Sequence, residues 1–470
     1  MSTPSRLTRR QFISGAAAFT AVIFADRSGL AGSIDRNAFA RLARRLKGRL
    51  ILPHEPGYQR ARVIHNGRFD NFPAAIAKCL DSSDVQRAVE FARVNALPVA
   101  VRSGGHDYAG YSTCDYGMVI DLCAMREVVV DRRARIATIQ MGAKIGHLYD
   151  SLWKDGFTAT AGTCASVGMG GLTLGGGIGP LACKYGLACD NMLSAEVVLA
   201  DGSIVHADGE KNSDLFWAIR GGGGNFGIVT QIEMRVFEIP RVLSGELSYS
   251  APELRDQLRF YRDFIRTAPD ELSTEVSIAG GNTLSISVCY TGDLDEGVRV
   301  LSPLLRFGTP GRTRLRAIAP PHAFISSAGR AGVAELATGA FFPELKDAAI
   351  DTICESIQAA PPGAEVGLDD LRGATMIGTS AFPIRSAGFD SWILADWARS
   401  RDGAAATSWV NDTRDALLPF SSGVYVNRLN REGEARVREA YGENYDRLST
   451  IKALYDPQNV FHLNQNIVPA

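Results

Sequence analysis

Neither sign of charge is in excess in this chain of 470 residues, which has 50 Lys and Arg against 51 Asp and Glu. Without an overall electrostatic field, the composition gives no support for nucleic acid or an anionic membrane as a partner. Histidine is scarce, with seven residues, and the eight cysteines contain no C-x-x-C pair. The patterns typical of zinc sites are therefore missing, and no metal is expected.

Long apolar runs are also missing. The run near the N-terminus, from Gly15 to Ala25, has about eleven residues, whereas a membrane-spanning helix needs roughly 20. Arg9 and Arg10 precede this run, so residues 1–33 are predicted to be a cleaved twin-arginine-type signal with its linker. The alternative is a basic start to an ordinary helix. We expect the export machinery to carry the precursor to the periplasm or the medium, with no membrane span.

Glycine, by contrast, is abundant. The chain has 48 glycines, more than the usual share of about 7%, and many of them lie within residues 162–227. Residues 177–182 match a loose G-x-G-x-x-A, and Asp201 follows at the distance expected of a dinucleotide-binding fingerprint. We reject this interpretation, because only a short segment follows Pro180 and because Asp201-Gly202 is a pair typical of hairpin turns.

Two other glycine-rich stretches suit a cofactor better: "RSGGHDYAGYS" at 102–112 and "GTCASVGMGG" at 162–171. Without Cβ atoms, successive backbone N–H groups can face a diphosphate, and the chain can pass close to a flat ring. If the two stretches are loops that face each other, they can hold one cofactor between them.

The apolar pattern predicts an α+β fold. A helix with Ser83 or Asp84 as its N-cap leads into a strand before the first glycine stretch. From about residue 240, strands alternate with helices and no further phosphate-loop signal occurs, which indicates a second domain. The last part is predicted to be a strand, a long helix and a tail.

Four motifs carry a family resemblance: "VRSGGHDYAGYS", "AGTCASVGMGGLTLGGGIGPLACKYGLACDN", "DLFWAIRGGGGNFGIVT" and "LYDPQNVFHLNQNI". They resemble the flavin-linked oxidases of the berberine bridge enzyme type, within the vanillyl-alcohol oxidase and p-cresol methylhydroxylase superfamily. The resemblance runs over about 58–236 and 424–467. It implies a two-lobed FAD-binding domain at 50–240 and a substrate-binding domain at 241–423, with an antiparallel sheet covered by helices. A C-terminal segment at 424–470 would return to the FAD-binding domain.

The resemblance also implies that FAD is joined to the chain twice, through the ring of His106 and the sulfur of Cys164. Such bonds need nucleophiles beside an electron-poor ring, and they raise the oxidising power of the flavin and prevent its loss. For Cys164 the alternative is an ordinary buried thiol. Val167 matches a small gate that admits oxygen, which favours an oxidase over a dehydrogenase. The alternative is an ordinary packing residue of its loop. The predicted cofactor-binding residues are Arg102, Ser103, Gly104, Gly105, His106, Ser112, Gly162, Cys164, Val167, Gly168, Gly170, Gly171, Gly175, Gly176, Gly177, Gly179, Asp190, Gly227, Ile228, Val229, Asn464 and Gln465.

The stretch "GVYVNRL" supplies the predicted catalytic residues. If it is a strand, its period of two places Tyr425 and Asn427 on one face, and the resemblance implies that Tyr425 is the base that takes a hydroxyl proton. An ordinary tyrosine has a pKa of about 10, so positive charge or hydrogen bonds must help it ionise. Otherwise Tyr425 is a core aromatic, and the base is Tyr108, Tyr111 or an acid of the second domain.

These observations predict an exported FAD-linked oxidase that takes hydride from an alcohol or sugar hydroxyl carbon and reduces O2 to H2O2. A sugar or oligosaccharide is the first expectation, because a doubly linked flavin goes with an open groove in several members of the family. The alternatives are a tailoring enzyme that oxidises an alcohol of a secondary metabolite, and a flavoprotein that binds a ligand without turnover. Arg385 resembles a substrate-side position of the family, although Ile384 replaces the histidine expected before it.

Overall fold

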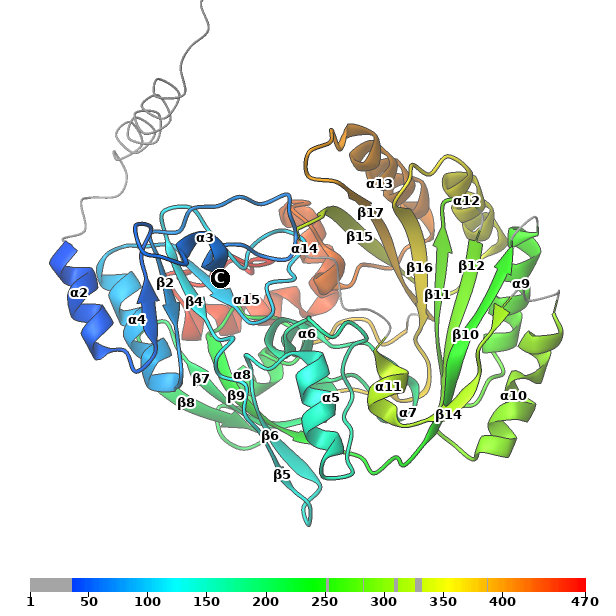
Figure 1. Cartoon of the computed structure of the whole chain (residues 1–470), viewed down its shortest axis with the longest axis horizontal. Helices are drawn as coiled ribbons and strands as arrows, with labels where there is room; N and C mark the ends of the chain where they lie inside the picture. The colour runs from blue at the N-terminus through cyan, green and yellow to red at the C-terminus, as the bar shows by residue number, and fades with distance from the viewer. Residues whose placement is uncertain (1–35, 251–252, 282, 308–311, 326–331, 387) are drawn as a thin grey trace, which may run out of the picture.

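The structure is a computed structural model that describes residues 36–250, 253–281, 283–307, 312–325, 332–386 and 388–470. The predicted signal therefore lies outside the described residues. Among the helices of these segments, none is long and apolar enough to cross a membrane. Three β-sheets, here called sheets I, II and III, make up the two halves of the molecule in Figure 1, with sheet III on the right.

Sheet I has four strands in the order β1-β2-β4-β3, with β1 antiparallel to β2 and the other pairs parallel. Its elements are β1 (Arg49–Ile51), β2 (Ala75–Lys78), β3 (Val99–Arg102), β4 (Met118–Asp121), α2 (Arg36–Arg45), α3 (Tyr58–Ala61) and α4 (Ser82–Val94). Helix α4 is capped by Asp81, which accepts a hydrogen bond from the backbone N–H of Asp84 at 3.0 Å. The predicted cap at Ser83 or Asp84 was wrong. The Asp84 carboxylate instead accepts from the backbone N–H groups of Lys47 and Gly48, both at 2.8 Å.

Sheet II has five antiparallel strands in the order β5-β6-β9-β7-β8. Its elements are β5 (Val128–Asp131), β6 (Ile136–Gln140), β7 (Met192–Val198), β8 (Ile204–Asp208), β9 (Ile228–Arg235), α5 (Ile145–Trp153), α6 (Met169–Gly175), α7 (Ala182–Tyr185), α8 (Ser213–Ala218) and the 3-10 turn η1 (Cys189–Asn191). The predicted hairpin at Asp201-Gly202 is confirmed, because it joins β7 to β8 and Gly202 has a φ of 89°. The helix that follows Pro180 directly, α7, has only four residues, so the long helix of a dinucleotide fingerprint is missing there.

Sheet III has eight antiparallel strands, in the order β13-β10-β12-β11-β16-β17-β15 with β14 beside β10. Its elements are β10 (Val242–Ser250), β11 (Leu272–Ala279), β12 (Thr283–Tyr290), β13 (Arg312–Thr313), β14 (Arg316–Ile318), β15 (Ala334–Phe342), β16 (Ala364–Asp370), β17 (Phe389–Trp397), α9 (Leu254–Ile265), α10 (Leu294–Arg306), α11 (Pro320–Phe324), α12 (Asp347–Gln358), α13 (Ala404–Leu417), η2 (Gly373–Met376) and η3 (Leu418–Phe420).

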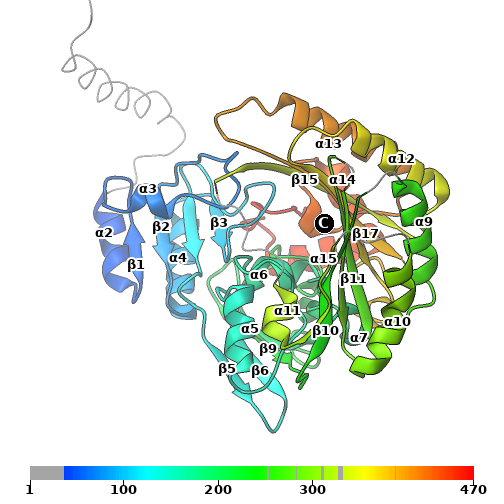
Figure 2. The ribbon, with the colours of Figure 1, turned by 45° about the vertical axis from the view of Figure 1, so that its right-hand side comes forward.

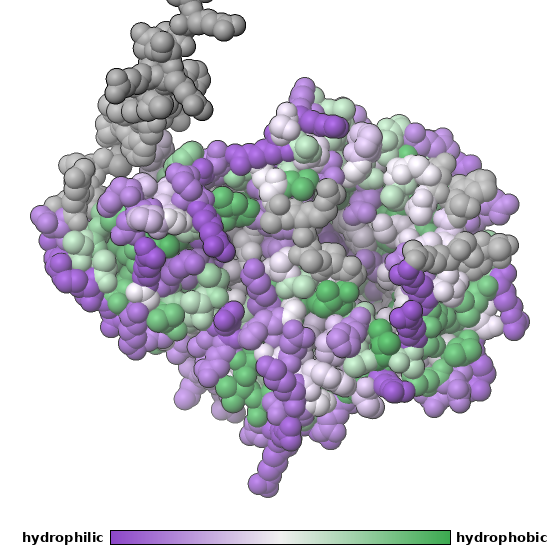
Figure 3. All heavy atoms as spheres, viewed as in Figure 1, coloured by the Kyte–Doolittle hydropathy of each residue, from purple (hydrophilic) through white to green (hydrophobic). Residues whose placement is uncertain are grey.

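Helices α9, α10, α12 and α13 cover the outer side of sheet III (Figure 2). Val276 and Ile278 belong to the buried core on that side. Because strand residues alternate between faces, Glu275 points the other way, toward sheets I and II. A second core cluster fills the half that contains sheets I and II. On the face shown in Figure 3, hydrophilic residues follow most of the outline and hydrophobic residues form small, separate groups.

The C-terminal segment leaves sheet III and returns to sheets I and II (Figure 1). Its elements are η4 (Val426–Arg428), α14 (Glu434–Tyr441), η5 (Gly442–Asn444) and α15 (Tyr445–Tyr455). The predicted strand at its start was wrong, because a 3-10 turn follows Tyr425 directly. Lys452 in α15 is fully buried, and its Nζ binds Asp456 Oδ2 at 2.6 Å and the carbonyl oxygen of Asn225 at 2.7 Å. This contact ties the tail to the glycine-rich loop before β9.

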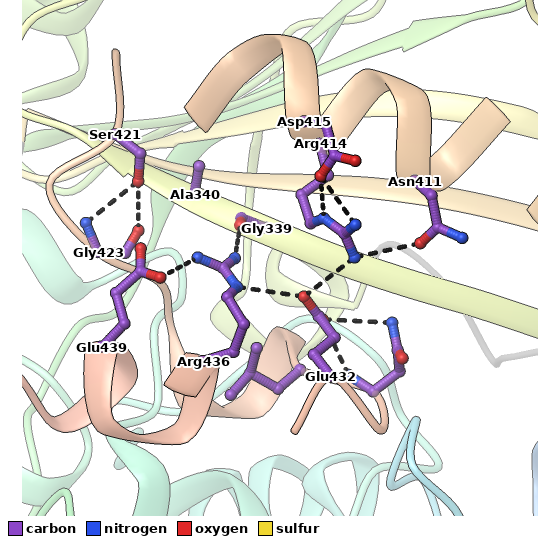
Figure 4. A network of polar contacts seen from close by, with 12 residues as sticks. Gly339, Ala340, Asn411, Arg414, Asp415, Ser421, Gly423, Glu432, Arg436 and Glu439 are labelled. Atoms are coloured by element: carbon purple, nitrogen blue, oxygen red, sulfur yellow. Dashed lines mark hydrogen bonds and ion pairs between the residues drawn. The ribbon is translucent and has the colours of Figure 1, made fainter. Parts of the chain in front are cut away.

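A network of polar contacts fixes the residues around η4 to sheet III (Figure 4). The carboxylate of Glu432 lies 3.2 Å from Arg436 Nε and 3.6 Å from Arg414 Nη1, which belongs to α13. Arg436 also donates a hydrogen bond to the carbonyl oxygen of Gly339 in β15 at 3.0 Å. The turn that carries Tyr425 is therefore held between the two halves of the molecule.

Candidate functional site

A cavity of about 520 Å³ lies where the three sheets meet the C-terminal segment. Its size is within the range of small-molecule and cofactor sites. We call the side formed by residues within 103–106 and 162–171 the glycine wall. We call the side formed by Glu275, Glu365 and Asp369 of sheet III, together with Arg428, the charged wall.

Most of the predicted site residues line this cavity. They are Ser103, Gly104, Gly105, His106, Ser112, Gly162, Cys164, Val167, Gly168, Gly170, Gly171, Gly179, Gly227, Ile228, Val229, Tyr425, Asn427, Asn464 and Gln465. Tyr108 and Tyr111, the alternative bases, also line it. The structure brings these residues together, and their roles toward a cofactor or a substrate stay predictions.

Five predicted residues do not line the cavity: Arg102, Gly175, Gly176, Gly177 and Asp190. Arg102 is buried, and its Nη2 donates to Asp121 Oδ2 at 2.8 Å. Gly175 lies beneath Asn427, where a Cβ atom would come within 2.3 Å of Oδ1. These residues support the wall from behind.

Asp190 and Arg385 form a partly buried ion pair, here called the clip. Neither residue lines the cavity, and Ile384 does not line it either. Nη1 and Nη2 of Arg385 donate to the two carboxylate oxygens of Asp190 at 2.8 and 2.7 Å. The guanidinium lies 5.0 Å from the centre of the Phe382 ring. That ring packs edge-on against Tyr425, with their centroids 5.9 Å apart. The clip therefore fixes the loop that supports Tyr425 and does not reach the cavity.

The glycine wall consists of two backbones in contact. A Cβ atom on Gly104 would come within 2.1 Å of the backbone nitrogen of Gly168, and a Cβ atom on Gly168 would come equally close to the nitrogen of Gly104. Ser103 strengthens the crossing, because its Oγ donates to the carbonyl oxygen of Met141 and accepts from the N–H of Gly170 at 3.3 Å. No side chain larger than hydrogen fits at the crossing.

His106 and Cys164 lie on this wall in different loops. Burial, with smaller contributions from the charges of His65 and Lys144, lowers the pKa of His106 to about 3. The ring is therefore neutral at ordinary pH and keeps a nitrogen lone pair. Cys164 is half-buried, with Sγ 3.5 Å from Ser166 Oγ. Both side chains have the form and the location that a nucleophile toward a bound ring needs.

The hydroxyl oxygen of Tyr425 accepts two hydrogen bonds. Its donors are the backbone N–H of Gly177 and Nδ2 of Asn427, both at 2.8 Å. Burial raises the pKa of Tyr425, while these two donors and the charge of Arg428 oppose the rise. Two donors and a nearby cation stabilise a phenolate. Tyr425 and Asn427 thus converge as predicted, although through a 3-10 turn and not through a strand.

Sequence reasoning offered an acid of the second domain as an alternative base but identified none of the residues of the charged wall. Glu275 on β11 stands opposite Asp369 on β16, which stands opposite Asp390 on β17, so the three carboxyl groups form a row across the sheet. Arg428 binds two of them, with Nη2 2.8 Å from Asp369 and Nε 3.1 Å from Asp390. Burial raises the pKa of all three carboxyl groups, and the charge of Arg428 opposes the rise.

Asp390 does not line the cavity, so Glu365 is the third carboxyl group of this wall, and it accepts from Trp392 Nε1 at 3.4 Å. A signal was present in the sequence, because "AEVGLDD" places Glu365 and Asp369 four residues apart, on one face of a strand, and "STEVSIA" places Glu275 between two apolar or hydroxyl residues of another strand. The strand register that aligns them could not be derived from it. Across the described residues, no group of three or more His, Cys, Asp and Glu side chains is placed to hold a metal ion.

The glycine wall and its surroundings in the cavity fit FAD in three ways. Its crossing loops expose backbone where a diphosphate or a flat ring needs close approach. It presents two nucleophilic side chains, one of them a neutral imidazole. Oδ1 of Asn464, which lines the same cavity, is buried and has no hydrogen-bond partner within the described part of the chain, so a donor of a bound ligand suits it.

Comparison with protein families matches residues 73–208 to an FAD binding domain and residues 424–468 to a family described as berberine and berberine like. An uncharacterized FAD-linked oxidoreductase of Bacillus subtilis (strain 168) is 32% identical over 440 residues, which cover 90% of this chain and 98% of that protein. (R)-6-hydroxynicotine oxidase of Paenarthrobacter nicotinovorans is 32% identical over 454 residues, covering 90% and 97%.

The solved structure of a chitooligosaccharide oxidase is similar as well. It matches with a TM-score of 0.83 and 25% identity, over 92% of this chain and 100% of that one. The similarity spans all three sheets. The predicted α+β architecture is therefore confirmed: a two-lobed cofactor-binding domain with a second domain whose antiparallel sheet is covered by helices.

Proposed function

Because the chain belongs to the berberine bridge enzyme-like family of FAD-linked oxidoreductases, we propose that it oxidises the hydroxyl-bearing carbon of a small molecule. The observation that carries the proposal is the environment of Tyr425. Its oxygen accepts two hydrogen bonds at 2.8 Å and lies on the same cavity as His106 and Cys164. One cavity thus combines a base with two attachment points for the cofactor.

Each of these groups has a separate role in the proposed reaction. FAD, when bound, supplies the acceptor for the hydride that leaves the substrate carbon. Tyr425 takes the hydroxyl proton, and the N–H of Gly177 and Nδ2 of Asn427 stabilise the charge left on its oxygen. Arg428, fixed by Asp369 and Asp390, adds positive charge beside the ring, with its guanidinium carbon 5.9 Å from the ring centre.

We propose further that His106 and Cys164 hold FAD covalently. Their loops touch at the glycine crossing, and both side chains reach the cavity. The neutral state of His106 supports its role as a nucleophile. A cofactor held in this way would stay with the chain after export.

Oxygen is the proposed electron acceptor, with H2O2 as the product. The position of Val167 supports this choice, because its small side chain lies on the glycine wall beside Cys164. A sugar or oligosaccharide is the first donor class, and the similarity to a chitooligosaccharide oxidase supports it. A tailoring reaction on an alcohol of a secondary metabolite is the close alternative.

The charged wall favours a second candidate donor, one with a positively charged amine. Its three carboxyl groups line the cavity, and Arg428 is the only cation among the residues that line it in the described structure. Similarity to (R)-6-hydroxynicotine oxidase is compatible with a nitrogen-containing donor. A positively charged amine bound there would offset negative charge on these carboxyl groups, which among the described lining residues only Arg428 now offsets.

A peroxide screen tests the proposed function. The purified yellow protein is incubated with sugars, oligosaccharides, aromatic alcohols and amines in the presence of O2, and H2O2 is measured. Peroxide from an alcohol supports the first candidate, and peroxide from amines alone supports the second. Reduction of the flavin by a donor without peroxide would show a dehydrogenase. A flavin that no donor reduces would point to a binding protein.

Export is part of the proposal, and the predicted signal at 1–33 supports it. Changing both Arg9 and Arg10 to lysine should leave the precursor, with its signal attached, in the cytoplasm. The fate of the protein is followed by fractionation and by the mass of its N-terminus. Normal export of this double variant would rule out the twin-arginine route.

A further inference from the structure

Three residues, 65–67, join the loop of His106 to the start of β15. Their segment follows α3 and reaches across to sheet III (Figure 1). The backbone N–H of His65 donates to the carbonyl oxygen of Gly105 at 3.0 Å, and the carbonyl oxygen of His65 accepts from the N–H of Gly332 at 2.9 Å. The segment therefore contacts the glycine wall on one side and the second domain on the other.

The next two residues make this contact specific. Asn66 donates through Nδ2 to the carbonyl oxygen of Glu335 at 2.9 Å, and its Oδ1 accepts from the N–H of Glu335 at 3.1 Å. The N–H of Gly67 donates to the carbonyl oxygen of Val333 at 2.7 Å. A Cβ atom on Gly67 would lie 2.4 Å from the carbonyl oxygen of Gly332. The register between the segment and β15 is thus fixed.

The side chains extend the same connection to the cavity. The ring of His65 stacks on the ring of His106, with centroids 3.8 Å apart and planes 19° from parallel. Nε2 of His65 lies 3.3 Å from Oε1 of Glu335, and the two side chains are only 10% and 13% exposed. Neither His65 nor Glu335 lines the cavity. They lie behind His106 and set one face of its ring.

This geometry matters because an imidazole reacts through a nitrogen lone pair, which lies in the plane of the ring. A partner stacked on one face restricts rotation of that plane, and the carboxylate restricts the partner in turn. The charge of His65 also contributes to keeping His106 neutral. Cys164, on the other loop, has its hydroxyl contact with Ser166 and is not part of this stack.

We propose that His65 and Glu335 are positioning residues that orient His106 for its bond to the flavin, so that this bond depends on the docking of β15. The inference rests on the proposed attachment of FAD at His106. It predicts an asymmetry: loss of the stack impairs the histidyl bond and spares the cysteinyl bond.

The test compares the two bonds in the same full-length chain. Wild type, His65→Ala, His65→Phe, Glu335→Ala and Glu335→Gln are purified, denatured and digested. Mass spectrometry then measures the fraction of the His106 peptide and of the Cys164 peptide that carries flavin. His206→Phe is the matched control, since it breaks another histidine–carboxylate pair, His206 with Asp208 at 3.1 Å, on an exposed part of sheet II.

In His65→Ala and Glu335→Ala, we expect the fraction of the His106 peptide that carries flavin to fall about fivefold or more, as for a lost hydrogen bond or ring contact. Attachment at Cys164 should stay near the wild-type value. His65→Phe keeps the stack and Glu335→Gln keeps an acceptor, so both should restore most of the histidyl bond. His206→Phe should match wild type.

Three results would overturn the inference. Unchanged attachment at His106 in both alanine variants would show that the stack is incidental. A parallel loss at His106 and Cys164, without rescue by the conservative variants, would show a general structural role. A wild-type chain with no flavin on the His106 peptide would refute the proposed attachment itself, and the wild-type sample distinguishes that failure from the first two.

Discussion

The cavity is bounded by two walls that are built in different ways. On the glycine wall, Gly104 and Gly168 allow two backbones to touch, and the space between them excludes any side chain. On the charged wall, sheet III presents Glu275 and Asp369 from neighbouring strands whose alternate residues face the helices. The glycine wall forms because glycine has no side chain, so that two backbones can touch. The charged wall forms because the strand register aligns particular side chains.

This difference determines what substitutions should do. Any atom added to the glycine wall displaces backbone, so such a substitution should reduce both cofactor binding and the stability of the fold. Removal of a charge from the charged wall leaves the backbone in place. Its effect should therefore be limited to binding of the donor or to the pH dependence of stability. The predictions below separate the two walls, beginning with the largest effect.

Gly104→Ala should abolish most flavin binding. Its methyl group would lie 2.1 Å from the backbone nitrogen of Gly168, and overpacking of this kind costs about 1–3 kcal/mol or more. The measurements are flavin absorbance per chain after gel filtration and the melting temperature. Gly209→Ala is the control, because a Cβ atom there meets nothing within 4 Å. Full flavin content in Gly104→Ala would mean that the loops can separate without harm.

Tyr425→Phe should keep its flavin but slow reduction by the donor by about 10²–10⁴-fold, the usual contribution of a general base. The variant removes one oxygen and leaves the ring packed against Phe382. Stopped-flow kinetics would follow flavin reduction, while reoxidation by O2 should be unchanged. Tyr111→Phe, on the same cavity, is the matched control. A fall of less than about tenfold in Tyr425→Phe would make it a wall residue, since a lost hydrogen bond alone explains roughly fivefold.

The glycine wall was largely predictable because its evidence is local. The spacing of glycines around His106 and Cys164 is visible in two short stretches, and no long-range pairing is needed to recognise them. The assignments that failed to reach the cavity involve distant partners. Arg102 binds Asp121, and Asp190 binds Arg385.

The charged wall was not predictable for the opposite reason. Glu275 and Asp369 meet only because β11 and β16 pair in one particular register, and a shift by one residue would turn every side chain to the other face. The same limit affected Tyr425 and Asn427. Their side chains converge as expected, but the expected strand is a 3-10 turn, and the chain after this turn contacts β15 and α13 through Arg436 and Glu432. These partners are distant in the sequence.

A smaller effect is expected when the glycine wall loses only one attachment point. His106→Ala and Cys164→Ala, made singly, should each retain flavin through the other residue, because the two side chains come from separate loops. The mass of the denatured chain should show the full FAD increment in each variant, and only the double variant should release flavin in acid. Loss of all covalent flavin in one single variant would show that the second bond forms only after the first.

The smallest effect should come from the charged wall, as a change in the pH dependence of stability. Burial, with the charge of Asp369, raises the pKa of Glu275 from 4.5 to about 8 in the folded protein. A carboxyl group with a raised pKa binds its proton more tightly in the folded than in the unfolded state. Its contribution to stability is therefore full below about pH 4.5 and is lost as the pH rises through about 8.

Glu275→Gln, which is neutral at every pH, should remove this loss. We expect equal melting temperatures for variant and wild type near pH 4.5, and a variant that melts about 2 °C higher near pH 8.5, which corresponds to ~2 kcal/mol in a protein of this size. Glu344→Gln, at an exposed position of the same domain, controls for the general change in charge. An equal difference at both pH values would mean that Glu275 acts by packing alone. The predicted rise in melting temperature would show that Glu275 of the charged wall reduces stability above neutral pH. Such a cost is expected of a residue that serves donor binding and does not stabilise the fold.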